Sequence, residues 1–259
     1  MAETLHSPKL LPARRRWLRA AAMLSTGSIA AAWLGCRQTK PPPSGLRYKR
    51  TIDAARNAIR SAMGKYSVAS ASLVLVDDGQ IAWQEVFGYV DKARKTAPSA
   101  TTMFAVGSLS KLVAGIATLI LVDRKLIDLD TPVTHYLRDF RMTSPAYRDI
   151  TVRMLLIHSS GLASTDGRNL FTQIPVPGYA LQVQENLRTT RLKYQPGEMA
   201  VYCNDGFTLL EGIIQSVAGK PYIQFIKDEL LTPLGMSHSR FPEQTFPAGS
   251  YAPAYMGDT

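Results

Sequence analysis

Two short segments, about ninety residues apart, contain residue types that could act together in nucleophilic catalysis. Ser108-Leu109-Ser110-Lys111 places a hydroxyl and an amine three positions apart. Residues i and i+3 share one face of a helix, so the lysine amine can lie beside the serine hydroxyl. This arrangement suits proton transfer, and it predicts that Ser108 attacks a carbonyl carbon.

The same pattern also allows a purely structural interpretation, in which Ser108 caps a helix and Lys111 reaches along apolar surface to water. A chain of this length contains about one such pair by chance. The surroundings favour chemistry, because Lys111 is the only charge from Ser108 to about Leu121. A lysine in an apolar helix costs several kcal/mol unless it is paired or neutral.

Four segments, taken together, identify a family. They are Phe104 to Lys111, Leu155 to Leu162, Pro196-Gly197 followed by Tyr202 and Asn204, and Pro233 to Met236. In order and approximate spacing, the chain from about residue 50 to 245 resembles the β-lactamase-related serine hydrolases. That family includes class C β-lactamases, serine D-alanyl-D-alanine peptidases and esterases.

The resemblance implies a role for each matched residue. Ser108 would form an acyl-enzyme, with Lys111 and Tyr202 as a coupled base and proton relay. A phenol with a pKa near 10 becomes a usable base when a neighbouring ammonium stabilises its anion. Asn204 would bind the substrate carbonyl and help to hold the lysine. The Ser108 amide would supply half of an oxyanion hole.

Several of these residues have structural alternatives. Tyr202 could be a half-buried aromatic residue with a satisfied hydroxyl, and Asn204 could cap the helix that follows it. By the resemblance, His158 orders its loop and is not a base. Cys203 stands where serine is common in the family, so a hydroxyl donor is lost.

The N-terminal region has the layout of an export leader. Arg14-Arg15-Arg16 precedes sixteen uncharged residues, Ala20 to Gly35, and residues 1–35 are therefore predicted to be a signal peptide. Leu34-Gly35-Cys36 resembles a lipobox, which predicts lipidation at Cys36, although ordinary cleavage nearby is the alternative. Residues 36–50 would form a tether, with Pro41-Pro42-Pro43-Ser44-Gly45 as its stiff-then-flexible spacer. The expected location is periplasmic or cell-surface, on a membrane through the lipid anchor.

Charge and cysteine content limit the other function classes. The net charge is +10, but residues 1–35 contribute +4 and residues 36–50 contribute +5, so the remainder is nearly neutral. Nucleic-acid binding therefore has no support from bulk charge. No His or Cys spacing fits a zinc site, and no cofactor is expected. The partners would be a small-molecule or peptide substrate and, through the lipid anchor, a membrane.

The expected fold is α/β and β-lactamase/transpeptidase-like, with an antiparallel sheet flanked by helices and a helical subdomain. Hydrophobic periodicity and turn residues predict two strands, 71–76 and 81–89, around a turn at 77–80. They also predict helices over about 51–64, 108–121, 152–158, 180–188, 205–218 and 221–231, with Thr151 capping the helix at 152–158. The domain would span 51–259, with its helical part at about 97–245.

The family's third motif, Lys-Thr-Gly or His-x-Gly on a strand, is absent after Pro233. The C-terminal strands are therefore expected to be missing, which would leave the two predicted strands with an exposed apolar face. The predicted function is hydrolysis of an amide, β-lactam or ester bond. The alternatives are a non-catalytic tethered module that binds penicillin or cell-wall peptide, and an inactive truncated fragment.

Overall fold

The computed structural model describes residues 47–91, 95–164, 176–241 and 250–253. All of them belong to one compact unit, Pro43–Thr259. The predicted signal peptide, Cys36 and most of the predicted tether lie outside the described residues. Within these described ranges, none of the helices has both the length and the apolar character needed to cross a membrane.

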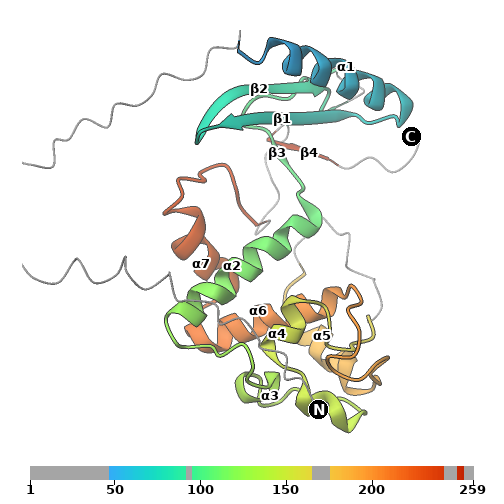
Figure 1. Cartoon of the computed structure of the whole chain (residues 1–259), viewed down its shortest axis with the longest axis vertical. Coiled ribbons are helices and arrows are strands. Elements are labelled where there is room, and N and C mark those ends of the chain that lie inside the picture. The colour runs from blue at the N-terminus through green and yellow to red at the C-terminus, as the bar shows by residue number, and fades with distance from the viewer. Residues whose placement is uncertain (1–46, 92–94, 165–175, 242–249, 254–259) are drawn as a thin grey trace, which may run out of the picture. The chain divides into compact units, whose positions relative to one another are not determined.

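An N-terminal helix packs on a β-hairpin, as the hydrophobic pattern predicts (Figure 1). The helix α1 spans Lys49–Lys65, and the antiparallel strands β1 and β2 span Ser70–Asp77 and Gln80–Gly88. Asp78 and Gly79 both have positive φ, at 49° and 71°. These angles are typical of the type I′ turn that suits a two-residue hairpin loop.

The two faces of this hairpin differ in how they are covered. On one face Arg56 of α1 donates to Glu85 at 2.7 Å and lies over the Trp83 ring. The opposite face carries Val74, Val76 and Ile81, which are 52–57% exposed. In the described ranges the hairpin is a two-stranded sheet, so the expected exposed apolar face is present.

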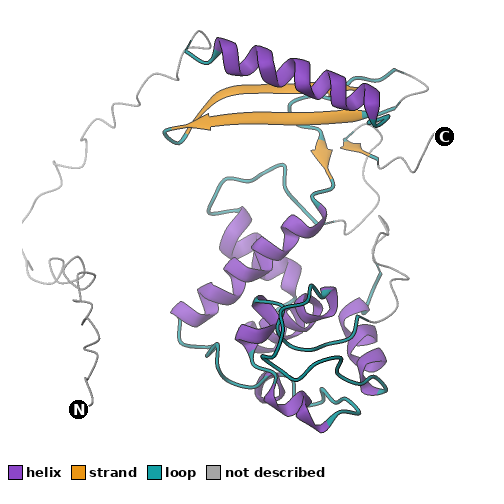
Figure 2. Cartoon of the chain, turned by 45° about the vertical axis from the view of Figure 1, so that its right-hand side comes forward, coloured by secondary structure: helices purple, strands orange, loops and turns teal. Residues whose placement is uncertain are grey.

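The remaining elements are mainly helical (Figure 2). In chain order they are β3 (Met103–Phe104), the 3₁₀ turn η1 (Gly107–Leu109), α2 (Ser110–Asp123), α3 (Val133–Tyr136), the 3₁₀ turn η2 (Pro145–Asp149), α4 (Val152–Leu156), α5 (Tyr179–Arg188), α6 (Asn204–Ala218), α7 (Tyr222–Ile226), the π-helical turn η3 (Lys227–Leu231) and β4 (Tyr251–Ala252). The predicted helices are confirmed, with ends shifted by a few residues.

Two local features illustrate how the sequence sets these elements. Thr151 caps α4, because its hydroxyl accepts from the Met154 amide at 3.3 Å, and the predicted N-cap is confirmed. The parallel pair of β3 and β4 was not predicted. Each of these strands has two residues, which is too short to show a hydrophobic period.

The core of the helical part is centred on α6, which packs against α2, α4, α5 and α7. Four apolar side chains of α6 are fully buried: Leu209, Leu210, Ile213 and Ile214. The helix α2 is almost wholly apolar in composition but only partly buried. Its Ala114 and Ala117 are buried, whereas Leu112 and Leu119 are 65% and 51% exposed, because described residues cover only one side of this helix.

The loop after α4 depends on a glycine. Gly161 has φ of 74°, and a Cβ atom built there would lie 2.2 Å from the Tyr194 carbonyl oxygen. The Gly161 carbonyl accepts from the Lys193 amide at 2.8 Å. The two backbone segments therefore approach so closely that a side chain cannot fit between them.

We expect Gly161→Ala to lower the free energy of unfolding by roughly 2 kcal/mol or more, because it adds both a clash and backbone strain. Urea denaturation of the purified chain measures the change. Gly64→Ala is the matched control. Gly64 lies near the end of α1, and an added Cβ atom there would have no neighbouring atom within 4 Å, so alanine should preserve or slightly raise stability. Equal effects of the two substitutions would contradict the close-approach explanation.

Candidate active site

Four predicted site residues from two distant segments form one hydrogen-bonded group. The Ser108 Oγ and the Tyr202 hydroxyl are 2.6 Å apart. The Lys111 Nζ donates to the Asn204 Oδ1 at 2.7 Å and, more weakly, to the Ser108 Oγ at 3.4 Å. The Lys111 ammonium therefore has a hydrogen-bond partner, the neutral amide of Asn204. This bond offsets part of the free-energy cost of an unpaired ammonium on an apolar helix.

A tight turn places the serine. Gly107 has φ of 53° and begins the 3₁₀ turn η1, which contains Ser108 and leads into α2. The sequence pattern predicted a helix from Ser108, whereas the α-helix begins at Ser110. The hydroxyl of Ser108 and the amine of Lys111 still meet, because the 3₁₀ turn and the first turn of α2 follow each other without a break. Ser108 lies at the start, where the first amides have no partner within the helix.

The second segment enters the site from an extended residue. Cys203, with φ of −142° and ψ of 125°, precedes α6, and Asn204 is the first residue of that helix. The structural alternative for Asn204, an N-cap, is therefore wrong. Side chains two positions apart in an extended backbone point to the same side. Tyr202 and Asn204 accordingly both contact the Ser108 and Lys111 group, while Cys203 points elsewhere.

The ammonium of Lys111 sets the electrostatics of the tyrosine. Its Nζ lies 4.7 Å from the centre of the Tyr202 ring. This neighbouring ammonium, together with the Ser108 hydrogen bond, lowers the pKa of the Tyr202 hydroxyl below its ordinary value of 10.0. The phenolate is therefore easier to form here than in water. Tyr202 is 54% exposed, so the group is open to a ligand.

Phe207 completes the surroundings of the lysine and was not predicted. The Lys111 Nζ lies 5.6 Å from the Phe207 ring centre, a second cation–π contact. Phe207 follows Asn204 by three residues on α6, so the two share a helix face. That spacing was the available signal in the sequence.

His158 supports the tyrosine segment. Its Nδ1 accepts from the Cys203 amide at 3.1 Å, and its ring lies 4.7 Å from the Tyr202 ring and 5.2 Å from the Phe207 ring. Burial, and then the positive charge of Lys111, lower the pKa of His158 below its ordinary 6.5. An acceptor nitrogen requires the neutral form, which agrees with the lowered pKa.

The backbone of the same loop holds the chain that leads to Tyr202. The His158 carbonyl accepts from the Val201 amide at 2.9 Å, and the Ser159 carbonyl accepts from the Gly197 amide at 2.8 Å. Ser159 and Ser160 are buried, and His158 itself has φ of 60°. These contacts fit the expected loop-ordering role of His158.

Cys203 is a buried thiol, not a candidate nucleophile. It is 2% exposed, and burial raises the pKa of its sulfhydryl. The Ser164 hydroxyl donates weakly to its sulfur at 3.9 Å. Cys203 forms no disulfide in the described part of the chain. Across those same residues no cluster of three His, Cys, Asp or Glu side chains forms that could hold a metal ion.

We expect the His158–Cys203 bond to make stability sensitive to acid. Because the folded-state pKa of His158 lies below the unfolded value, its contribution is complete above about pH 6.5 and is lost as pH falls through the folded-state pKa. His158→Asn should remove this acid-sensitive part, since asparagine tolerates positive φ and its oxygen can accept without titrating.

The measurement is the free energy of unfolding of the wild type and of the His158→Asn and His158→Ala variants, at neutral pH and near pH 5. His158→Ala should lose about 1 kcal/mol at neutral pH, where the hydrogen bond is intact in the wild type. Parallel pH curves for the wild type and His158→Asn would show that neutral His158 is not the acid-sensitive acceptor.

Comparison with known proteins places this geometry in a family. A family model described as Beta-lactamase matches residues 55–259. Among curated relatives, Protein flp of Staphylococcus aureus (strain MW2) is 28% identical over 186 residues, covering 70% of this chain and 36% of that protein. The putative penicillin-binding protein PbpX of Bacillus subtilis (strain 168) is 29% identical over 187 residues, covering 70% of this chain and 45% of PbpX.

A solved structure agrees with these relatives. The crystal structure of a class C β-lactamase in complex with cefoxitin superposes with a TM-score of 0.67 at 26% identity, covering 80% of this chain and 55% of that one. The chain thus spans between about a third and about a half of the length of these relatives. Its fold is the β-lactamase/transpeptidase-like α/β fold, and the chain belongs to the β-lactamase family.

Proposed function

We propose that the protein is a serine hydrolase that forms an acyl-enzyme at Ser108 and hydrolyses an amide, β-lactam or ester bond. The observation that carries the proposal is the contact of the Ser108 Oγ with the Tyr202 hydroxyl at 2.6 Å, beside the Lys111 ammonium. A hydroxyl hydrogen-bonded to a phenol of lowered pKa is the arrangement that an activated nucleophile requires.

In the proposed first step the Ser108 oxygen attacks the substrate carbonyl carbon and passes its proton to the phenolate of Tyr202. The Lys111 ammonium stabilises that phenolate before the proton arrives. The carbonyl oxygen becomes an oxyanion, and the Ser108 amide at the start of its turn would donate to it. When the intermediate collapses, the carbon–nitrogen or carbon–oxygen bond breaks, and Tyr202 gives its proton to the leaving group.

In the second step water replaces the leaving group. Tyr202, again as phenolate, takes a proton from water, and the resulting hydroxide attacks the ester carbon of the acyl-Ser108. Collapse of that intermediate releases the carboxylic acid product and returns the proton to the serine oxygen. Asn204 keeps the amine in place throughout, because its Oδ1 accepts from the Lys111 Nζ at 2.7 Å.

The substrate class proposed here is an acyl compound with a small, accessible carbonyl group. Two features support it: the exposure of Tyr202, and a class C β-lactamase of the same fold that was solved in complex with cefoxitin. Esters, peptides and β-lactams share the same carbonyl chemistry, and a common fold does not choose among them.

We expect a fluorescent penicillin or a fluorophosphonate probe to label the purified chain at Ser108. Ser108→Ala should abolish labelling, because it removes the oxygen that forms the covalent bond. Ser110→Ala is the matched control, since Ser110 is also exposed and lies two residues away outside the hydrogen-bonded group. Labelling of the Ser108→Ala variant would overturn the proposal. An acyl-Ser108 that forms but never turns over would favour the non-catalytic binding module.

We further expect Tyr202→Phe to slow the acylation rate by roughly 10²- to 10⁴-fold, the usual contribution of a positioned base. Phenylalanine keeps the ring between His158 and Lys111, so the loss reports on the hydroxyl. With the wild type, the rate should rise with pH and level off below pH 10, because the pKa of Tyr202 is lowered. Stopped-flow labelling across this range measures both, and an unchanged rate in Tyr202→Phe would exclude the relay.

We also propose that the protein is exported and anchored through a lipid on Cys36. The arginine run at Arg14 to Arg16, the uncharged stretch to Gly35 and the cysteine that follows support this. Metabolic labelling with a fatty-acid analogue should mark the wild type and leave Cys36→Ser unmarked. Equal labelling of both proteins would remove the anchor from the proposal.

A further inference from the structure

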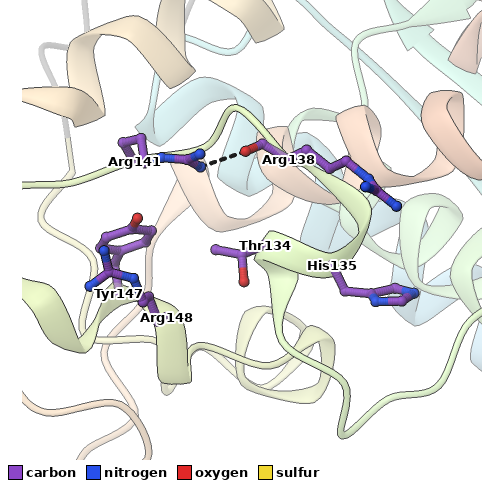
Figure 3. Close-up of a pocket in the computed structure, with 6 residues that line it drawn as sticks. All are labelled: Thr134, His135, Arg138, Arg141, Tyr147 and Arg148. Atoms are coloured by element: carbon purple, nitrogen blue, oxygen red, sulfur yellow. Dashed lines mark hydrogen bonds between the residues drawn. The ribbon is translucent and has the colours of Figure 1, made fainter.

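A pocket lies on the helical part, and its lining shares no residue with the Ser108 group. Its volume is about 510 Å³, and the residues that line it are Thr134, His135, Arg138, Arg141, Tyr147 and Arg148. Figure 3 shows Arg141 and Arg148 on one side of Thr134, with the Arg138 and His135 side chains on the other. The lining residues thus include three arginines and neither Asp nor Glu.

One of these guanidinium groups is fixed by the backbone. Arg141 donates from its Nη1 to the Phe140 carbonyl oxygen at 2.7 Å, and also to the Arg138 carbonyl oxygen (Figure 3). These bonds hold the group without neutralising its charge, because the acceptors are uncharged carbonyls. A guanidinium has five N–H donors, so others remain for a ligand.

A second guanidinium is placed by a core aromatic residue. Arg148 of η2 lies over the Tyr147 ring, with its central carbon 5.0 Å from the ring centre. Tyr147 is 4% exposed and packs edge-on against Phe140, so the ring has a fixed position. Stacking on a fixed ring reduces the conformational entropy that Arg148 would lose when it binds a ligand.

The arginines that line this pocket differ in their ion pairing from three other arginines of the helical part. Three arginines elsewhere on the helical part pair with carboxylates: Arg124 with Glu229, Arg153 with Asp130, and Arg188 with Glu185. Within the described ranges, Arg138, Arg141 and Arg148 take part in no such ion pair. A bound anion would give these guanidinium groups a charged hydrogen-bond partner.

We propose that this pocket binds a phosphate-bearing anion, supplied either by a soluble phosphate compound or by a phospholipid headgroup. Guanidinium forks match phosphate oxygens in geometry, and a phosphate monoester carries more negative charge near neutral pH than a single carboxylate. The volume falls in the range of small-molecule sites, so the pocket has room for more than one inorganic ion.

The experiment titrates the full chain with pyrophosphate in solution and, separately, with vesicles of phosphatidylcholine with and without phosphatidic acid. Calorimetry and vesicle co-sedimentation measure the two kinds of binding. We expect saturable binding in at least one arm. Binding to pyrophosphate identifies a soluble phosphate source, and binding restricted to the vesicles that contain phosphatidic acid identifies a headgroup.

Variants separate a built site from general positive charge. Arg138→Gln with Arg148→Gln should weaken binding about tenfold or more, the loss expected for one charge-assisted hydrogen bond. The matched control, Arg50→Gln with Arg60→Gln, removes the same charge from exposed positions on α1 and should leave the affinity unchanged. Arg148→Lys should also weaken binding, because it keeps the charge but loses the fork.

Three results would overturn the proposal. The first is the lack of saturable binding in both arms, and the second is an equal loss of affinity in the control pair on α1. The third is citrate binding as tightly as pyrophosphate, since that would show a site for carboxylates and not for phosphate. Melting curves of each variant without ligand show whether the fold is retained, and Arg148→Lys still tests the proposal if the double variant is unstable.

Discussion

The arrangement of the Ser108 group depends on one hydrogen bond, from the Lys111 ammonium to the Asn204 amide oxygen. Lys111 lies in the first turn of α2 and Asn204 is the first residue of α6, so the bond joins the starts of two packed helices. The amide partner is neutral, which leaves the full positive charge of Lys111 available to the phenol beside it. A carboxylate at the same place would pair with the lysine and weaken its effect on Tyr202.

The surrounding structure holds the first turns of α2 and α6 close to each other. Buried leucines and isoleucines of α6 form the core that holds this helix in place. The loop after α4 forms backbone hydrogen bonds with the segment that precedes α6. Gly161 permits the close approach of this loop to the Tyr194 backbone, and the His158 Nδ1 accepts from the amide of Cys203, the residue before Asn204. The geometry of the site therefore depends on a part of the chain that has no reacting group of its own.

The sequence predicted the elements well where the signal was local. The amphipathic period of α1, the Asp78-Gly79 turn and the Thr151 cap each need only a few neighbouring residues, and each is present. Features that depend on contacts between distant segments were missed: the parallel pair of β3 and β4, the positive φ of His158 and the Phe207 ring beside Lys111. The exposure of Leu112 was also missed, because composition shows that a helix is apolar but not which faces are covered.

The roles of Ser108, Lys111, Tyr202 and Asn204 came from the family resemblance, whereas their mutual distances come from the fold. Spacing alone brought Ser108 and Lys111 together, since three residues on a helix do so for any side chains. Nothing local in the sequence could bring Tyr202 within hydrogen-bonding distance of Ser108, which precedes it by 94 residues. Likewise, nothing local in the sequence marks Arg138, Arg141 and Arg148 as residues of one pocket, because the fold of the segment from α3 to η2 places them there.

The extended conformation of Cys203 divides three consecutive residues between two environments. Tyr202 and Asn204 turn toward the nucleophile, while the side chain between them is 2% exposed and packs inside the protein. The middle position is therefore limited by volume: cysteine and serine differ little in size, whereas a branched or aromatic side chain would have to displace core atoms. Tyr202 and Asn204 are the residues on either side of Cys203 in the chain. A shift of the Cys203 backbone would therefore move both the Tyr202 phenol and the Asn204 amide.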